Sequence, residues 1–324
     1  MAGKKNWATG FALAAAFAYA AAKAVGRARQ ADLRGEVAVV VGGSRGLGLM
    51  IARELAAAGC RLVIGARDLD QLRAAQRDLE ARGAEVLIWQ CDVGNRRDID
   101  LLVAEAGERF GRIDILVNVA GLIQVGPAES MTIDNFRDAF AVNFWGPLHA
   151  MDAVIAQMQE RRHGRIVNIT SIGGELPVPH LLPYVCAKAA AMALSDGLGA
   201  ELEKDGIRVT TVVPGLMRTG SFPHAFFKGN ATREMNWFRA LATNPITAMS
   251  ARRAARRIVA AMARGEPQLV LTVSAKLGRV AVAVLPGFVR RLFALGNRLL
   301  SSGERDRAKR ERTGRELLEA AQPG

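Results

Sequence analysis

The feature that most constrains the fold is a regular alternation of strand-like and helix-like segments between residues 36 and 273. Strands that alternate with helices of about ten residues or more form parallel βαβ units. We therefore expect one α/β domain, an open, doubly wound, mainly parallel sheet of seven strands with helices on both faces. The expected strands are 36–41, 61–66, 85–90, 114–119, 165–169, 208–213 and 268–273. The expected helices are 46–58, 69–81, 98–110, 132–159, 182–203 and 251–264.

The net charge of +13 lies in the two ends of the chain. Residues 1–30 carry +5 and residues 251–324 carry +10, whereas residues 31–250 carry −2. A nucleic-acid-binding protein would carry its basic charge on the folded body, so we expect no nucleic-acid partner. Basic ends beside apolar segments fit an anionic membrane surface, and solvated basic tails remain the alternative.

Cysteines and histidines give no sign of a metal site. Cys60, Cys91 and Cys186 are an odd number and far apart, and the four histidines lie at no metal-ligand spacing. We therefore expect neither a metal ion nor a disulfide framework. Free thiols also suit a reducing compartment, which favours a cytoplasmic location for the central domain.

The N-terminal segment lies outside the alternating pattern. Residues 7–22 are uncharged and mostly apolar, with basic residues on both sides. A spanning helix needs about 20 apolar residues, with about 17 as the lower limit. A membrane anchor, a non-spanning helix and a cleaved signal peptide all remain open. We divide the chain into this segment (1–30), the α/β domain (31–274) and a basic C-terminal extension (275–324).

The C-terminal extension contains an amphipathic helix at 285–300. Its basic residues fall outside its apolar face. Such a helix can lie in a membrane interface or dock on its own domain, and both alternatives stay open. Residues 301–324 are highly charged, and we expect them to be disordered. The apolar face consists of Phe288, Leu292, Leu295 and Leu299, at i, i+4, i+7 and i+11.

A glycine-rich loop follows the first expected strand and opens the first expected helix. Glycines let the backbone turn tightly and approach a pyrophosphate, which the helix N-terminus attracts. A tight turn without a ligand is the alternative. The expected cofactor contacts are Gly42, Ser44, Arg45, Gly46, Leu47 and Gly48.

This Gly-x-x-x-Gly-x-Gly spacing resembles that of the short-chain dehydrogenase/reductase family. The family's usual form begins with Thr, where this chain has Val41, so one local hydrogen bond is lost. The resemblance covers residues 34–273. It implies a Rossmann-type fold, an NAD(P)-dependent oxidoreductase and a homo-oligomer, either a dimer or a tetramer.

The second expected strand ends without an acid, at Ala66-Arg67. An acid there would bind a ribose 2′-hydroxyl and repel a 2′-phosphate. The guanidinium groups of Arg45 and Arg67 instead suit a phosphate dianion. We therefore expect NADP(H) rather than NAD(H); the alternative is that Arg67 is solvated and pairs with Asp68 or Asp70.

Three further loops match the family's cofactor contacts. The resemblance implies that the first contacts adenine, that the second passes close to the cofactor, and that Thr219 contacts the nicotinamide carboxamide. The residues are Asp92 and Val93; Asn118, Ala120 and Gly121, with Val119 replacing the family's second Asn; and Pro214, Gly215 and Thr219.

The candidate catalytic residues follow. Tyr184 and Lys188 are four residues apart on an expected helix and share one face. A free tyrosine has a pKa near 10, and a neighbouring ammonium would lower it. The resemblance implies that Tyr184 exchanges the proton, that Lys188 also holds the nicotinamide ribose, that Ser171 hydrogen-bonds the substrate oxygen and that Asn143 organises the proton relay.

The family's substrate lid matches residues 217–241, which are rich in aromatic side chains. Because most ligand pockets have apolar linings, these residues suggest a lipophilic alcohol or ketone; packing of the lid onto the body is the alternative. A non-catalytic NADP(H)-binding sensor on the same fold is the rival function. The lid residues are Met217, Phe222, Phe226, Phe227, Trp237 and Phe238.

Overall fold

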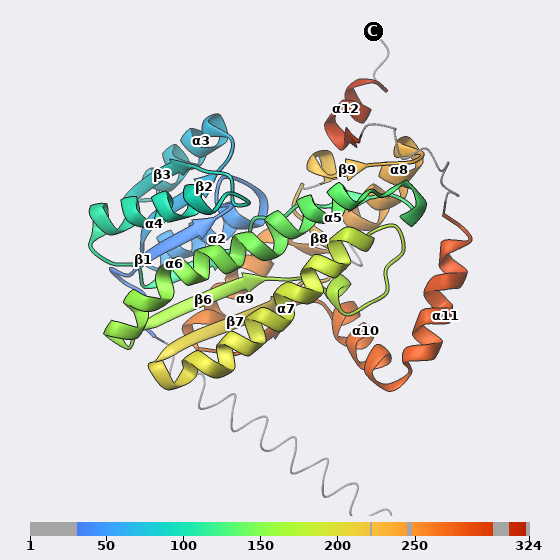
Figure 1. The fold of residues 1–324 in the computed structure, drawn as a ribbon. Coiled ribbons are helices and arrows are strands. Elements are labelled where there is room, and N and C mark those ends of the chain that lie inside the picture. The colour runs from blue at the N-terminus through green and yellow to red at the C-terminus, as the bar shows by residue number, and fades with distance from the viewer. Residues whose placement is uncertain (1–30, 221, 245–247, 301–310, 322–324) are drawn as a thin grey trace, which may run out of the picture.

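The central sheet has the seven parallel strands that the sequence predicts. The computed structural model describes residues 31–220, 222–244, 248–300 and 311–321 (Figure 1). The strand order is β11-β7-β6-β4-β1-β2-β3, which is the Rossmann-type arrangement of two halves that meet beside β1. The strands are β1 (Val37–Val41), β2 (Arg61–Ala66), β3 (Val86–Gln90), β4 (Ile115–Asn118), β6 (Gly164–Ile169), β7 (Ile207–Val213) and β11 (Gln268–Val270).

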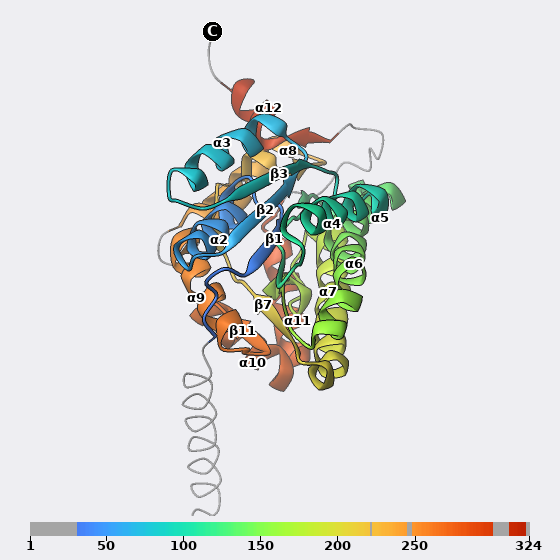
Figure 2. The same ribbon diagram turned by 90° about the vertical axis from the view of Figure 1, so that its left-hand side faces the viewer.

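Helices cover both faces of this sheet (Figure 2). One layer contains α2 (Gly46–Ala57), α3 (Leu69–Glu80) and α9 (Ala251–Ala263). The other contains α4 (Arg96–Phe110), α5 (Ile133–Phe140), α6 (Gly146–Arg161) and α7 (Leu182–Leu202).

Two apolar cores lie between the sheet and its helices. Along β1, Ala38 and Val40 point into one core and Val37, Val39 and Val41 into the other, because successive strand residues face opposite sides. All five are buried. Burial on both faces explains why the strands are continuous apolar runs rather than alternating ones.

The long helix expected at 132–159 is interrupted. Thr132 and Asn135 form a capping box at the start of α5. The helix then widens into a π-helical turn, Ala141–Trp145, before α6 begins. A π-helical turn contains one residue more than the α-helix would, and such turns are frequent at functional sites. This one contains Asn143.

Residues 311–321 correct the expectation of a disordered tail. Strand β12 (Arg312–Thr313) pairs antiparallel with β9 (Phe226–Phe227), which pairs with β5 (Gln124–Val125). Helix α12 (Gly314–Glu319) follows, and Leu317 is buried beside Phe227 and α8 (Ala231–Thr243). A capping box and one well-placed leucine order this segment despite its charge.

The last expected strand is shorter than predicted, and an additional helix follows it. Strand β11 ends at Val270, because the Thr272 hydroxyl accepts a hydrogen bond from the Ala275 N–H at 3.1 Å and so caps α10 (Val273–Val284). Helix α11 (Pro286–Asn297) comes next. None of the helices in the described ranges is long and apolar enough to cross a bilayer. Residues 7–22, the candidate anchor, lie outside those ranges.

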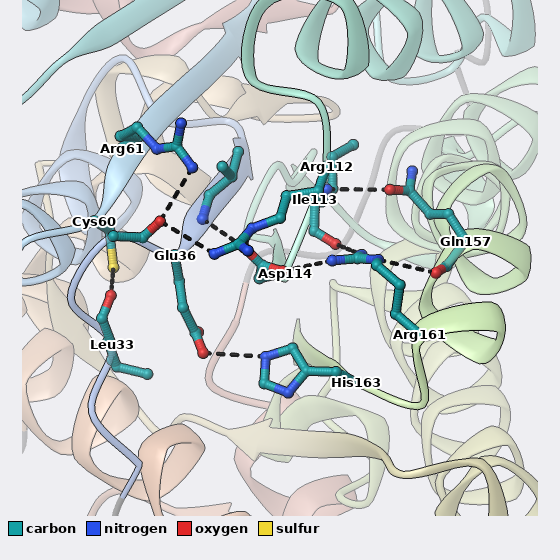
Figure 3. Close-up of polar contacts among 12 residues, drawn as sticks. Leu33, Glu36, Cys60, Arg61, Arg112, Ile113, Asp114, Gln157, Arg161 and His163 are labelled. Carbon is teal, nitrogen blue, oxygen red and sulfur yellow. Dashed lines mark hydrogen bonds and ion pairs between the residues drawn. The ribbon is translucent and has the colours of Figure 1, made fainter.

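A polar cluster closes the amino ends of the strands, opposite the functional residues (Figure 3). Buried Asp114 accepts hydrogen bonds from the Val37 N–H at 2.9 Å and from Arg161 at 2.6 Å, and it pairs with Arg112. Burial acts to raise the pKa of Asp114, but these donors outweigh it and lower the pKa. The cluster therefore joins β1 to β4 and α6.

Candidate active site

A cavity of about 720 Å³ opens at the carboxyl ends of the parallel strands. Doubly wound sheets bind ligands at this edge. The cavity gathers most of the predicted site residues from segments far apart in sequence. These are Gly42, Ser44, Arg45, Gly46, Leu47, Gly48, Arg67, Val93, Ala120, Gly121, Ser171, Tyr184, Lys188, Pro214, Gly215 and Thr219.

The glycine loop forms a cradle that side chains would fill. Gly42 has a φ of +93°, and a Cβ there would lie 2.6 Å from the Ala120 N. A Cβ on Gly48 would lie 2.0 Å from the Gly42 carbonyl oxygen. Arg45, the residue before α2, makes no side-chain cap to the helix. The first backbone N–H groups of α2 therefore receive no hydrogen bond from a capping side chain, and the residues around them line the cavity, an arrangement that fits a pyrophosphate.

Basic side chains surround one corner of the cavity. Burial lowers the pKa of Arg45, and the positive charges of Arg67 and Arg315 lower it further. Burial also lowers the pKa of His224, with Arg45 and Arg315 adding to the effect. Arg315 belongs to α12, so the C-terminal segment contributes positive potential here. A corner in which cations destabilise one another suits a doubly charged anion.

The two acids that could have neutralised Arg67 are engaged elsewhere. Asp68 caps α3, accepting hydrogen bonds from the Gln71 N–H at 3.0 Å and from the Gln71 side-chain amide at 2.7 Å. Asp70 lies 3.8 Å from Arg73. Among the described residues, no ion pair joins Arg67 to either acid. The structure therefore contradicts the alternative that Arg67 pairs with Asp68 or Asp70.

Ser171 and Tyr184 meet at the end of β6. Ser171 lies two residues beyond the strand, and its hydroxyl accepts a hydrogen bond from the Gly173 N–H at 3.0 Å. Tyr184, in the first turn of α7, shares a hydrogen bond with Ser171. Burial raises the pKa of Tyr184 and that hydrogen bond lowers it, with burial the larger effect. The net direction is opposite to the one expected from the neighbouring lysine.

Lys188 lies one turn further along α7 and is 4% exposed. Its Nζ donates a hydrogen bond to the Ile169 carbonyl at 2.8 Å and lies 5.9 Å from the centroid of the Tyr184 ring. Burial lowers the pKa of Lys188 to about 8. The ammonium and the phenol thus lie together in one desolvated part of the site.

Asn143 acts behind the cavity wall. It is fully buried, and its side-chain amide donates to the Leu122 carbonyl at 2.9 Å and to the Ala139 carbonyl at 3.0 Å. A Cβ on Gly121 would lie 3.3 Å from the Asn143 Oδ1 and 3.9 Å from the Lys188 Nζ. Asn143 and Lys188 therefore both border the space that a side chain on Gly121 would fill.

Two predicted contacts do not line the cavity. The Asp92 side chain is exposed and accepts a hydrogen bond from the Gly94 N–H at 2.9 Å. Asn118 is buried within β4 and donates to the Asn168 Oδ1 at 2.8 Å. Its side chain joins β4 to β6 and does not reach the cavity lining.

The lid residues divide between the two roles that the sequence left open. Met217 and Phe238 line the cavity. Phe227, by contrast, is fully buried in an apolar cluster that Phe238 also joins, and Phe222 and Trp237 pack against that cluster. Phe226 lies next to Phe227 in β9 and does not line the cavity.

Several lining residues carried no recognisable pattern in the sequence. They come from irregular segments after β6, from α8 and from α10, and they share only an apolar or small side chain. They include Leu176, Val178, Leu181, Leu241, Ala242, Ser274 and Ala275.

Comparison with known proteins decides the family. A family model described as short chain dehydrogenase matches residues 36–230. The chain belongs to the short-chain dehydrogenase family. A mouse relative described as dehydrogenase/reductase SDR family member 7B is 30% identical over 270 residues, which cover 82% of each chain.

Solved structures of the short-chain dehydrogenase family agree. A short-chain dehydrogenase from Streptomyces avermitilis is 31% identical, with a TM-score of 0.69, over 82% of this chain and all of that one. A variant of the actinorhodin polyketide ketoreductase, solved with NADPH, is 32% identical, with a TM-score of 0.66, over 76% and 99%. This short-chain dehydrogenase is therefore an oxidoreductase with an NAD(P)-type cofactor site.

Proposed function

We propose that this short-chain dehydrogenase is NADP(H)-dependent and interconverts a lipophilic ketone and the corresponding alcohol. The observation that carries the proposal is that the glycine cradle and the Ser171–Tyr184–Lys188 group face one continuous cavity. When bound in this cradle, the dinucleotide would supply hydride-transfer chemistry for the reduction of a carbonyl carbon and for the reverse oxidation. All other roles belong to residues of the chain.

The cofactor preference rests on charge. Arg45 and Arg67 would hold the 2′-phosphate, with Arg315 adding positive potential. Ala66 stands where an acid would repel that phosphate. The actinorhodin ketoreductase, one of the similar solved structures, was crystallised with NADPH. Gly42, Gly46 and Gly48 would let the pyrophosphate approach the N-terminus of α2.

The proton chemistry is assigned to the Ser171–Tyr184–Lys188 group. In reduction, the Tyr184 hydroxyl gives its proton to the substrate oxygen while Ser171 hydrogen-bonds the same oxygen. The buried Lys188, with a pKa of about 8, can replace that proton. Asn143 positions the Leu122 segment and so the backbone beside Lys188.

The substrate class rests on the cavity wall opposite the cofactor cradle. Its side chains are mainly aliphatic or aromatic, and they provide few groups able to bind a charged substrate. The wall residues are Leu176, Val178, Leu181, Met217, Phe238 and Leu241.

NADPH oxidation with a panel of bulky bicyclic and long-chain ketones tests this function, with Tyr184→Phe as the matched control. We expect turnover by the wild type and none by the variant. NADPH binding without turnover of any ketone or alcohol would instead support the sensor. A salt-dependent affinity for DNA would support the nucleic-acid rival, against which the near-neutral central body argues.

We also place the catalytic body in the cytoplasm, at a membrane, as a homo-oligomer. Three cysteines are free, two of them buried, which suits a reducing compartment. The basic residues beside apolar segments at both ends of the chain favour an anionic lipid surface. Cell fractionation tests the location: recovery of the full chain wholly in the soluble fraction at low salt would contradict it.

A further inference from the structure

Helices α10 and α11 expose an apolar surface, hereafter the α10–α11 surface (Figure 1, orange). It holds nine of the fourteen large hydrophobic side chains that are exposed among the described residues. Soluble monomers rarely expose contiguous apolar patches of this kind except at interaction sites. The surface consists of Val273, Leu277, Val280 and Val284 from α10, Leu285 at the junction, and Phe288, Leu292, Leu295 and Leu299 from α11 and the turn after it.

The two helices are seated on the body through other faces. Ala275 of α10 is 2% exposed, and Val289 of α11 is 5% exposed. The apolar residues recur at i, i+4, i+7 and i+11 in each helix, yet they are 56–80% exposed. The alternative that this amphipathic helix docks its apolar face on its own domain is therefore wrong.

The charge of this segment identifies the partner. Residues 267–303 contain five basic residues and no acid. Arg290, Arg291 and Arg298 are exposed beside the apolar residues of α11, and Lys276 is exposed on α10. An apolar face bordered by cations is the pattern of a helix that lies in an anionic bilayer interface. Arg279 pairs with Glu175, but a symmetric contact between two copies would still bring the eight remaining like charges together.

The α10–α11 surface begins beside the cavity. Ser274 and Ala275, in the first turn of α10, line it, and exposed Val273 precedes them. A Cβ on Gly278 would lie 3.1 Å from Leu176, another lining residue. Leu241 of α8 lines the cavity and is 46% exposed. Helix α10 therefore contacts the cavity through one face of its first turns and exposes its apolar residues on an adjoining face.

We propose that the α10–α11 surface docks on an anionic lipid bilayer, so that a lipophilic substrate enters the cavity directly from the bilayer. The evidence for docking is the exposed apolar surface and the basic side chains beside it. The access route rests on the proposed function as well. The two parts can be tested separately.

Docking is tested with the full chain and an environment-sensitive thiol dye. Leu295→Cys places the dye on the α10–α11 surface and Leu101→Cys places it on α4, both with Cys186→Ser, since Cys60 and Cys91 are buried. Vesicles contain phosphatidylcholine with or without phosphatidylglycerol, and doxyl-labelled lipid serves as quencher. We expect a blue shift and quenching at position 295 alone, with the anionic vesicles alone.

Two results would overturn docking. One is an unchanged spectrum at position 295 while the protein co-sediments with anionic vesicles, which would assign membrane binding to another segment. The other is a shift at position 295 that grows with protein concentration without vesicles, which would make a second copy of the chain the occupant.

The access route is tested with the double variant Phe288→Glu/Leu292→Glu. We expect turnover of a long-chain ketone carried in anionic vesicles to fall about tenfold. Turnover of a short, water-soluble ketone should be unchanged, which also shows that the variant folds. Equal loss on both ketones would refute the route. Absence of turnover by the wild type on either ketone would refute the proposed function, and the dye experiment would still decide docking.

Discussion

The Nζ of Lys188 donates a hydrogen bond to the carbonyl oxygen of Ile169 at 2.8 Å, in a site where the lysine is almost wholly buried. The last residue of β6 therefore holds the only charged group of the Ser171–Tyr184–Lys188 group. One carbonyl offsets little of the cost of burying an ammonium, so the pKa of Lys188 falls to about 8.

This burial predicts a pH-dependent difference in stability. Below pH 8, Lys188 is protonated in both the folded and the unfolded chain. The full free-energy cost of burying its charge then lowers the stability of the folded state. Between pH 8 and 10.5, the unfolded chain binds the proton and the folded chain does not, so stability rises with pH. The free energy of unfolding of the wild type, minus that of Lys188→Met, should rise by about 3 kcal/mol over this range. Urea titrations at several pH values measure it, and a constant difference would contradict the assignment.

Tyr184→Phe should lower turnover by at least about 100-fold, because the hydroxyl is the proposed proton donor. Cofactor affinity should change by less than about twofold, since the ring that packs in the cavity is retained. Stopped-flow turnover and NADPH fluorescence titration measure the two effects. Lys188→Ala should impair both, and substantial activity in Tyr184→Phe would assign the proton to another group.

Arg67→Ala should weaken NADPH binding by about tenfold or more and leave NADH binding nearly unchanged. The reason is that the arginine at the end of β2 is free of both neighbouring acids and faces the 2′-phosphate corner. Dissociation constants for both dinucleotides measure this. Arg73→Ala, which removes an exposed arginine of α3, is the matched control. Equal wild-type affinities for NADPH and NADH would contradict the cofactor assignment.

Leu317→Ala should destabilise the protein by about 2–3 kcal/mol, because it leaves a cavity beside Phe227. Leu318→Ala, at the partly buried neighbour, should cost less. Urea unfolding measures both. Limited proteolysis should cut the Leu317→Ala chain near α12 first. Equal and small losses of stability from both substitutions would mean that the packing of α12 contributes little to the stability of the lid segment.

The sheet, its helices and most of the cofactor cradle could be predicted from the sequence. The periodicity of apolar residues and the glycines of a loop are both visible within a short stretch of sequence. Within the loop, a Cβ on Gly48 would meet the Gly42 carbonyl oxygen, and Gly42 itself has a φ of +93°. Where the Asp92 and Asn118 side chains lie could not be predicted in this way. Whether a polar side chain at a strand end faces the cavity or a neighbouring strand depends on tertiary contacts. The Asn118 side chain, for example, donates a hydrogen bond to Asn168 of the neighbouring strand β6.

The C-terminal segment shows the same limit. Its charge predicted disorder, yet Leu317 and the pairing of β12 with β9 order residues 311–321. A two-residue strand carries no period that sequence analysis can detect. The direction of the pKa of Tyr184 was also mispredicted, because spacing reveals a neighbouring lysine but not the burial of both groups.

The π-helical turn at Ala141–Trp145 has a consequence for how the length of this chain can change. A π-helical turn holds one residue more than an α-helical one, so deleting one residue there would restore a regular helix. The segments on either side could keep their packing on the sheet and on α7. Asn143 would then move by about 100° around the helix axis, away from Leu122. A single deletion at this point would thus preserve the fold while it removed Asn143 from its place beside Leu122.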